Sequence, residues 1–189
     1  MSVNNLEFLN VAGYKFEPLE NLDSLIPEFQ NKCDELGLKG SVYLSPNGIN
    51  FSIAGTEENI DTYIQFMEED SRFRDIPLKK TFSETQPFRR MKVRLKKEII
   101  SLGRDDINPK EITGEYISPQ ELFEIYENKK DVIVLDIRNE YETRVGAFEN
   151  SIDLQLDTFR DFPSAVQTLP DEYKDKQIVM YCTGGIRCE

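Results

Sequence analysis

The 189-residue chain contains no histidine, and this absence removes several kinds of active site from consideration. Histidine is the commonest metal ligand and the commonest general base in enzymes. A Cys-His protease and a two-histidine iron centre are therefore excluded. Any reactive side chain in this protein must be assisted by backbone amides, cations or carboxylates.

Cysteine is also scarce, with only Cys33, Cys182 and Cys188 along the chain. Three unevenly placed cysteines cannot form a disulfide framework, and no pair has the spacing of a zinc knuckle. Cys33 falls on the apolar stripe of a predicted helix, where a core thiol is expected. The sequence thus predicts no metal site and gives no evidence for a cofactor.

No apolar run is long enough to cross a bilayer, and the first residues lack the basic and apolar regions of a signal peptide. We therefore expect a cytoplasmic protein with no membrane partner. The sequence does not indicate the oligomeric state.

Positive charge is scarce overall, with a net charge of −12, but it is concentrated in one segment. Residues 79–97 carry a local charge of +7, which leaves −19 on the rest of the chain. The overall balance argues against indiscriminate nucleic-acid binding, and we expect no DNA partner. A basic segment on an acidic protein favours one specific polyanion.

The first part of the chain predicts an α+β domain of ferredoxin-like βαββαβ order over residues 1–102. The predicted elements are a strand over 6–16, a helix from about Asn21 to Gly37, a hairpin with its turn at 45–48, a helix capped by Thr56, a less clear strand at 79–82 and a clearer one over 88–99.

In that last strand, apolar residues alternate with four basic residues: Arg90, Lys92, Arg94 and Lys96. Period-two alternation places all four on the outer face of a half-buried strand. A solvated strand face without a partner is one interpretation. Contact with a phosphate backbone is the other, and we favour it because the protein is otherwise acidic.

Residues 103–117 contain few apolar side chains and are interpreted as a linker. The second domain, residues 118–189, opens with a capping box at Ser118 and contains two continuous apolar runs, 132–135 and 178–181. Such runs are typical of buried parallel strands. Because ligands bind beyond the carboxyl ends of parallel strands, Asp136, Arg138 and Cys182 are expected to converge. For Asp136 and Arg138, a structural ion pair is an equally good interpretation.

The stretch from Cys182 to Glu189 combines a strand end, a cysteine, two glycines and an arginine. Gly184 and Gly185 allow the backbone amides to turn inward, and Arg187 supplies a fixed positive charge, so that the Cys182 thiolate is favoured. A buried, inert cysteine beside an ordinary Gly-Gly turn is the simpler alternative. Cys188 is either a packing residue or a thiol that resolves an oxidised or persulfidated Cys182.

The stretch 182–189 resembles the active-site loop of rhodanese domains, in the version found in the tRNA uridine 5-hydroxylase family. Rhodanese-like sulfurtransferases have six residues from cysteine to arginine, as here, whereas phosphatases of the Cdc type have one more. The stretch 136–151 resembles the second rhodanese signature, but Ala147 stands in the place of its histidine and Asn150 in the place of a glycine. These departures fit the hydroxylase family better. That family also resembles the chain at 42–50, 90–99 and 159–163.

The resemblance implies an α/β rhodanese-like second domain and an oxidoreductase that uses molecular oxygen to convert the wobble uridine of tRNA to 5-hydroxyuridine. Cys182 would be its active-site residue, through a covalent thiol or persulfide intermediate. Two alternatives stay open: a sulfurtransferase that carries a persulfide on Cys182, and a non-catalytic RNA- or protein-binding module. The resemblance also implies further structure after Glu189, so we expect the second domain to be incomplete.

Overall fold

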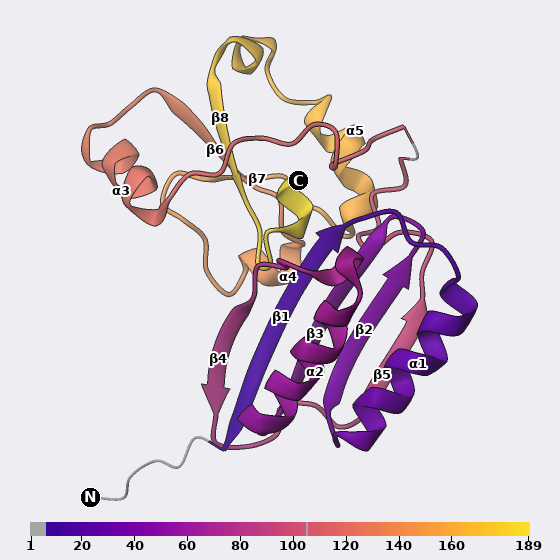
Figure 1. Ribbon diagram of the computed structural model, residues 1–189. Helices are drawn as coiled ribbons and strands as arrows, with labels where there is room; N and C mark the ends of the chain where they lie inside the picture. The colour runs from indigo at the N-terminus through magenta and orange to yellow at the C-terminus, as the bar shows by residue number, and fades with distance from the viewer. Residues whose placement is uncertain (1–6, 105) are drawn as a thin grey trace, which may run out of the picture. The chain divides into compact units, whose positions relative to one another are not determined.

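The computed structural model describes residues 7–104 and 106–189, which form two compact units that divide between Ile99 and Ile100 (Figure 1). The first unit ends at Ile99, before the predicted domain end at residue 102, and Ile100 and Leu102 pack against the core of the second unit. The described residues of 103–117 contain turns but no helix or strand.

The first unit is a five-stranded sheet in the order β4-β1-β3-β2-β5. Its elements are β1 (Phe8–Phe16), α1 (Leu22–Glu35), β2 (Lys39–Ser45), β3 (Gly48–Gly55), α2 (Glu57–Glu69), the short 3₁₀ helix η1 (Ser71–Phe73), β4 (Lys79–Ser83) and β5 (Met91–Leu95). The elements from β1 to β4 have the ferredoxin-like βαββαβ order. The predicted fold class of this domain is confirmed, although Leu6 lies outside the described residues.

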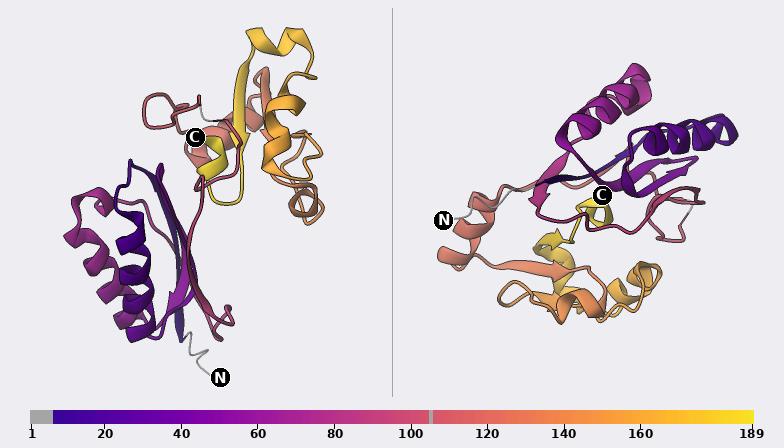
Figure 2. Two further views of the ribbon diagram at one scale, coloured as in Figure 1. Left: turned by 90° about the vertical axis from the view of Figure 1, so that its right-hand side faces the viewer. Right: turned by 90° about the horizontal axis from the view of Figure 1, so that it is seen from below.

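Both helices of the first unit cover the same face of the sheet (Figure 2). The apolar stripe of α1 contributes Leu25, Phe29 and Cys33 to the core, and α2, capped by Thr56, contributes Tyr63. Each fully buried large apolar side chain stabilises the fold by roughly 1.5–3 kcal/mol. Burial also raises the pKa of Cys33 to about 11, as expected for a core thiol.

The hairpin between β2 and β3 forms as predicted, but Gly48 lies in β3 and is not one of the two turn residues. Ser45 pairs directly with Gly48, so the turn itself consists of residues 46 and 47. Gly48 has a φ of 144°, and a Cβ atom at this position would lie 2.1 Å from the carbonyl oxygen of Lys15. Glycine is therefore required by the close approach of β1.

The basic strand β5 is shorter than the predicted 88–99 and lies outside the βαββαβ order. It pairs in parallel with β2 at the sheet edge. The strand ends at Leu95, and the backbone N–H of Lys96 still donates to the carbonyl of Leu44 over 2.8 Å. Asn47 and Asn50 then bind the backbone of Ile99. Met91 and Val93 pack against the core, whereas Leu95 is 52% exposed.

The second unit is built on a three-stranded parallel sheet in the order β7-β6-β8. Its elements are α3 (Pro119–Glu127), β6 (Val132–Asp136), α4 (Glu140–Thr143), β7 (Ile152–Asp153), η2 (Phe159–Asp161), α5 (Phe162–Val166), η3 (Asp171–Asp175), β8 (Gln177–Tyr181) and η4 (Ile186–Cys188). Leu135, Ile137, Leu156 and Phe159 form the centre of its core. The predicted capping box at Ser118 is present at the start of α3.

Among the helices of the described residues, none has both the length and the apolar character that spanning a membrane requires.

Candidate active site

The carboxyl ends of β6 and β8 lie side by side in the second unit, because the two apolar runs pair in parallel. The register places Asp136 opposite Tyr181, and the backbone N–H of Ile137 donates to the carbonyl of Tyr181 over 3.2 Å. The residues that follow the two strands are therefore neighbours. This is the edge at which ligands bind in parallel sheets.

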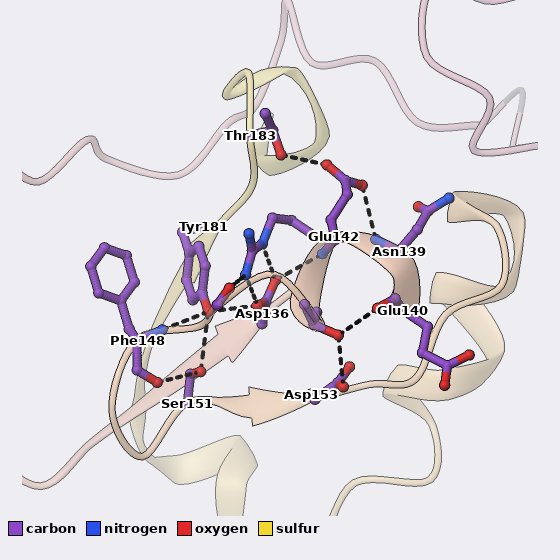
Figure 3. Close-up of polar contacts among 12 residues, drawn as sticks. Asp136, Asn139, Glu140, Glu142, Phe148, Ser151, Asp153, Tyr181 and Thr183 are labelled. Atoms are coloured by element: carbon purple, nitrogen blue, oxygen red, sulfur yellow. Dashed lines mark hydrogen bonds and ion pairs between the residues drawn. The ribbon is translucent and has the colours of Figure 1, made fainter.

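Asp136 is completely buried at the end of β6 and is held by a dense set of hydrogen bonds (Figure 3). The Arg138 side chain donates to both of its carboxylate oxygens, at 2.9 and 2.6 Å, and the Tyr181 hydroxyl donates at 2.6 Å. Burial alone would raise the pKa of Asp136, but these bonds hold it below the ordinary value. Arg138 also donates to the carbonyl of Gly146 at 2.6 Å. Asp136 and Arg138 thus anchor the loop after β6, and none of the hydrogen bonds or ion pairs among residues 7–104 and 106–189 joins either of them to Cys182.

The loop that follows β8 wraps its backbone around the sulfur of Cys182. The backbone N–H of Gly185 donates to Sγ of Cys182 over 3.0 Å. Gly185 has a φ of 90°, a conformation that favours glycine. Gly184 has no positive φ, and a Cβ there would meet nothing within 4 Å. Of the two glycines, only Gly185 adopts a backbone conformation that favours glycine over other residues.

Cys182 is a thiolate at neutral pH in this arrangement. The side-chain hydrogen bond with Cys188 is the largest cause, and together with the backbone N–H groups of Arg187, Gly184 and Gly185 it outweighs burial and lowers the pKa of Cys182 to about 5. The same hydrogen bond and burial raise the pKa of Cys188 far above its ordinary value. Cys188 therefore stays protonated and donates to Cys182.

Arg187 lies in the loop as expected, but most of its hydrogen bonds go to Glu142. Nη1 and Nη2 of Arg187 lie 2.9 and 2.8 Å from the two carboxylate oxygens of Glu142, and Nη1 also donates to Asn139 at 3.0 Å. Burial disfavours the charged guanidinium, whereas Glu142 and, to a smaller extent, Cys182 raise the pKa of Arg187. The arginine therefore fixes the loop while adding positive charge near the sulfur.

Glu142 also belongs to this site, although its role was not predicted from the sequence. It lies in α4, where its carboxylate accepts from Arg187, from the Thr183 hydroxyl and from the backbone N–H of Asn139. Burial would raise the pKa of Glu142, but these donors lower it to about 2. The signal was present in the sequence, since Asn139 and Glu142 have the spacing of a capping box directly after a buried strand.

Asn150 replaces the glycine expected from the rhodanese signature, and its backbone explains why asparagine fits. It has a φ of 57°, in the left-handed region that asparagine tolerates better than other non-glycine residues. Ala147 stands where the signature has histidine, so this loop offers no imidazole to the site.

The four predicted RNA-binding residues belong to the first unit and do not all lie on the strand. Lys92 and Arg94 are in β5, while Arg90 precedes it and Lys96 follows it. The carbonyl of Arg90 accepts from the backbone N–H of Gly40. Lys92 and Arg94 lie beside β2, and the Lys96 ammonium lies over the ring of Tyr43 in the same strand.

No group of three or more cysteine, aspartate or glutamate side chains suited to a metal ion occurs within residues 7–104 and 106–189.

Comparison with protein families ends the first domain at residue 99, where the first compact unit also ends. The family model of the UPF0176 acylphosphatase like domain matches residues 8–99, and that of the rhodanese-like domain matches residues 118–189. The predicted rhodanese-like class of the second domain is confirmed.

Curated relatives extend over nearly the whole chain. A tRNA uridine(34) hydroxylase of Cupriavidus pinatubonensis is 39% identical over 189 residues, covering 97% of this chain and 67% of the relative. A protein of the same name from Legionella pneumophila strain Paris is 41% identical over 183 residues, covering 97% and 72%. Among solved structures, an acylphosphatase from Bacillus subtilis is 14% identical with a TM-score of 0.37, covering 46% of this chain and 97% of that one.

Proposed function

Because the chain belongs to the tRNA uridine(34) hydroxylase family, a family of oxidoreductases, we propose that it converts the wobble uridine of tRNA to 5-hydroxyuridine with molecular oxygen as co-substrate. The observation that supports a role for Cys182 is the low pKa of its thiol within a loop of inward-facing N–H groups. A substrate tRNA is also consistent with a cytoplasmic location.

Cys182 is proposed to act as a nucleophile toward the uracil ring. Its thiolate adds to C6, and the electrons of the C5–C6 double bond move onto the ring carbonyl, which makes C5 electron-rich. One atom of molecular oxygen then becomes the hydroxyl on C5, and the other leaves as water. Two thiols supply the two electrons and two protons and become a disulfide. Loss of the C5 proton and departure of Cys182 restore the double bond.

The other residues of the loop have supporting roles in this proposal. The N–H groups of Gly184, Gly185 and Arg187 hold negative charge on the sulfur. Cys188 is proposed to keep Cys182 ionised by donating its hydrogen bond, and to serve as one of the two reducing thiols. Asp136 and Arg138 hold the neighbouring loop.

The basic residues of the first unit are proposed to contact the tRNA: Arg90, Lys92, Arg94 and Lys96.

The proposal is tested by mass spectrometry of tRNA nucleosides from cells that lack their own tRNA uridine(34) hydroxylase. We expect 5-hydroxyuridine to return when the cells express the chain, and to stay absent with Cys182→Ser. A protein that restores 5-hydroxyuridine with Cys182→Ser as well as with Cys182 would exclude the nucleophilic role. Failure to trap an adduct between Cys182 and substrate RNA under turnover would argue against the covalent step.

A sulfurtransferase activity is a second candidate, favoured by the rhodanese-like domain and by the six-residue loop from Cys182 to Arg187. In that reaction, the Cys182 thiolate takes the outer sulfur of thiosulfate, releases sulfite and becomes a persulfide. Cyanide then removes the sulfur as thiocyanate and regenerates the thiolate. Formation of thiocyanate that depends on Cys182 would support this activity, and its absence would exclude it.

A further inference from the structure

The sheet of the first unit has one face covered by α1 and α2 and an opposite face that neither of these helices covers (Figures 1 and 2). Val42 and Leu44 of β2 are completely buried against the helices. Side chains alternate along a strand, so Ser41 and Tyr43 point to the opposite face. We call this the open face.

The strand register shows which side chains are neighbours on the open face. Tyr43 of β2 pairs with Asn50 of β3 on one side and with Arg94 of β5 on the other. Ser41 pairs with Ser52 and with Lys92 in the same way. On the open face, Tyr43 and Ser41 therefore have small or polar neighbours on β3 and the cations Lys92 and Arg94 on β5.

The cations at this edge have no acidic partners within the described residues. None of the ion pairs found among residues 7–104 and 106–189 involves Lys92, Arg94 or Lys96. The Lys96 ammonium instead lies 5.0 Å from the centre of the Tyr43 ring. Arg94 and Lys96 thus adjoin the half-buried Tyr43 ring, and Lys92 lies one register step away beside Ser41. This concentration of unneutralised positive charge contrasts with the net charge of −12 on the chain.

This combination matches the chemistry of unpaired nucleotides. Proteins that bind single-stranded RNA stack bases on aromatic side chains and track the phosphates with Lys and Arg. Lys92 and Arg94 are two residues apart on one strand, about 7 Å, a spacing that successive phosphates of a single strand can follow. A duplex, whose bases are already stacked, would leave the Tyr43 ring without a partner.

We propose that the open face around Tyr43 binds unpaired nucleotides of the RNA substrate, with Tyr43 stacking on a base and Lys92, Arg94 and Lys96 contacting the flanking phosphates. The identity of the RNA rests on the proposed function, since an enzyme that modifies the wobble uridine acts on a single-stranded loop.

The test is fluorescence anisotropy with the full chain and two probes, an anticodon stem-loop RNA with uridine at position 34 and a blunt RNA duplex of the same length. Tyr43→Ala should weaken stem-loop binding about tenfold and leave duplex binding unchanged. Tyr43→Phe, which keeps the ring, should bind within about twofold of the unsubstituted chain. Circular dichroism melting of each variant shows whether the fold is retained.

Charge variants test the phosphate contacts. Arg94→Gln should weaken stem-loop binding and lower the slope of log affinity against log salt by about 0.7. Lys32→Gln on α1, at the helix-covered face, removes the same charge and should leave binding unchanged. Equal losses for Arg94→Gln and Lys32→Gln, or equal effects of Tyr43→Ala on both probes, would overturn the proposal.

Assays of 5-hydroxyuridine formation separate this proposal from the proposed function. If the chain hydroxylates tRNA but Tyr43→Ala leaves KM unchanged, the open-face proposal fails and the function stands. If stem-loop binding depends on Tyr43 but no 5-hydroxyuridine forms, the RNA surface stands and the proposed reaction fails.

Discussion

The reactivity of Cys182 depends on hydrogen bonds that stabilise its negative charge. Since the pKa of Cys182 is lowered to about 5, the thiolate is already present at neutral pH. We expect its alkylation rate with iodoacetamide to be nearly constant above about pH 6 and to fall as the pH drops through about 5. Mass spectrometry of the labelled peptide measures this rate for Cys182 apart from Cys33, whose thiol is buried. A rate that keeps rising up to about pH 9 would contradict the assignment.

Glu142 holds the active-site loop through Arg187 and Thr183, so its charge should contribute to stability. We expect Glu142→Gln to lower the free energy of unfolding of the second unit by roughly 1–3 kcal/mol at neutral pH. The pKa of Glu142 lies at about 2 in the folded chain, below its ordinary value of 4.5. Its stabilisation is therefore complete above the ordinary value and is lost as the pH falls toward about 2. Urea denaturation at several pH values measures both effects.

Glu140 provides a matched control on the same helix, because it pairs with Arg144 at the exposed surface. Glu140→Gln should change the free energy of unfolding by less than about 0.5 kcal/mol. Similar effects of the two substitutions would show that the Glu142–Arg187 pair has no special role.

At the scale of the element, the turn from β8 into η4 depends on one of its two glycines. An alanine at position 185 would adopt a φ of 90° only at a cost of roughly 1–3 kcal/mol. Relaxation of the loop to avoid this strain would move the backbone N–H of residue 185 away from Cys182. We expect Gly185→Ala to slow the alkylation of Cys182 near pH 6 several-fold. Gly184→Ala, which meets open space, should alkylate at close to the normal rate. Equal rates for both variants would contradict this account of the turn.

At the scale of the whole molecule, the two units should differ in stability. The central strands of the first sheet carry core side chains that are almost completely buried, whereas Ile178 and Met180 of β8 are 41% and 38% exposed. We expect hydrogen exchange measured by mass spectrometry to be faster in β6 and β8 than in β1 and β3. Uniform protection across both sheets would instead indicate a single cooperative unit.

The sequence alone determined most of the secondary structure and the nature of the reactive residue. Apolar periodicity, capping residues and turn residues act over a few neighbouring positions, so α1, α2, the β2–β3 hairpin and the runs that become β6 and β8 could be predicted. The spacing from Cys182 to Arg187 is likewise local, and it identified the loop. The extent of β5 was overestimated, because its end depends on Asn47 and Asn50, which bind the backbone of Ile99.

The tertiary structure decided which side chains meet. The pairing of β6 with β8 brings Glu142 to Arg187 across 45 positions of the chain, and a local pattern does not specify such a partner. The geometry of η4 places the Cys188 thiol against Cys182, and the register of β2 with β5 places Tyr43 beside Arg94. Hydrogen bonds, ion pairs and pKa shifts depend on distances between atoms, and folding alone fixes those distances for residues far apart in the sequence.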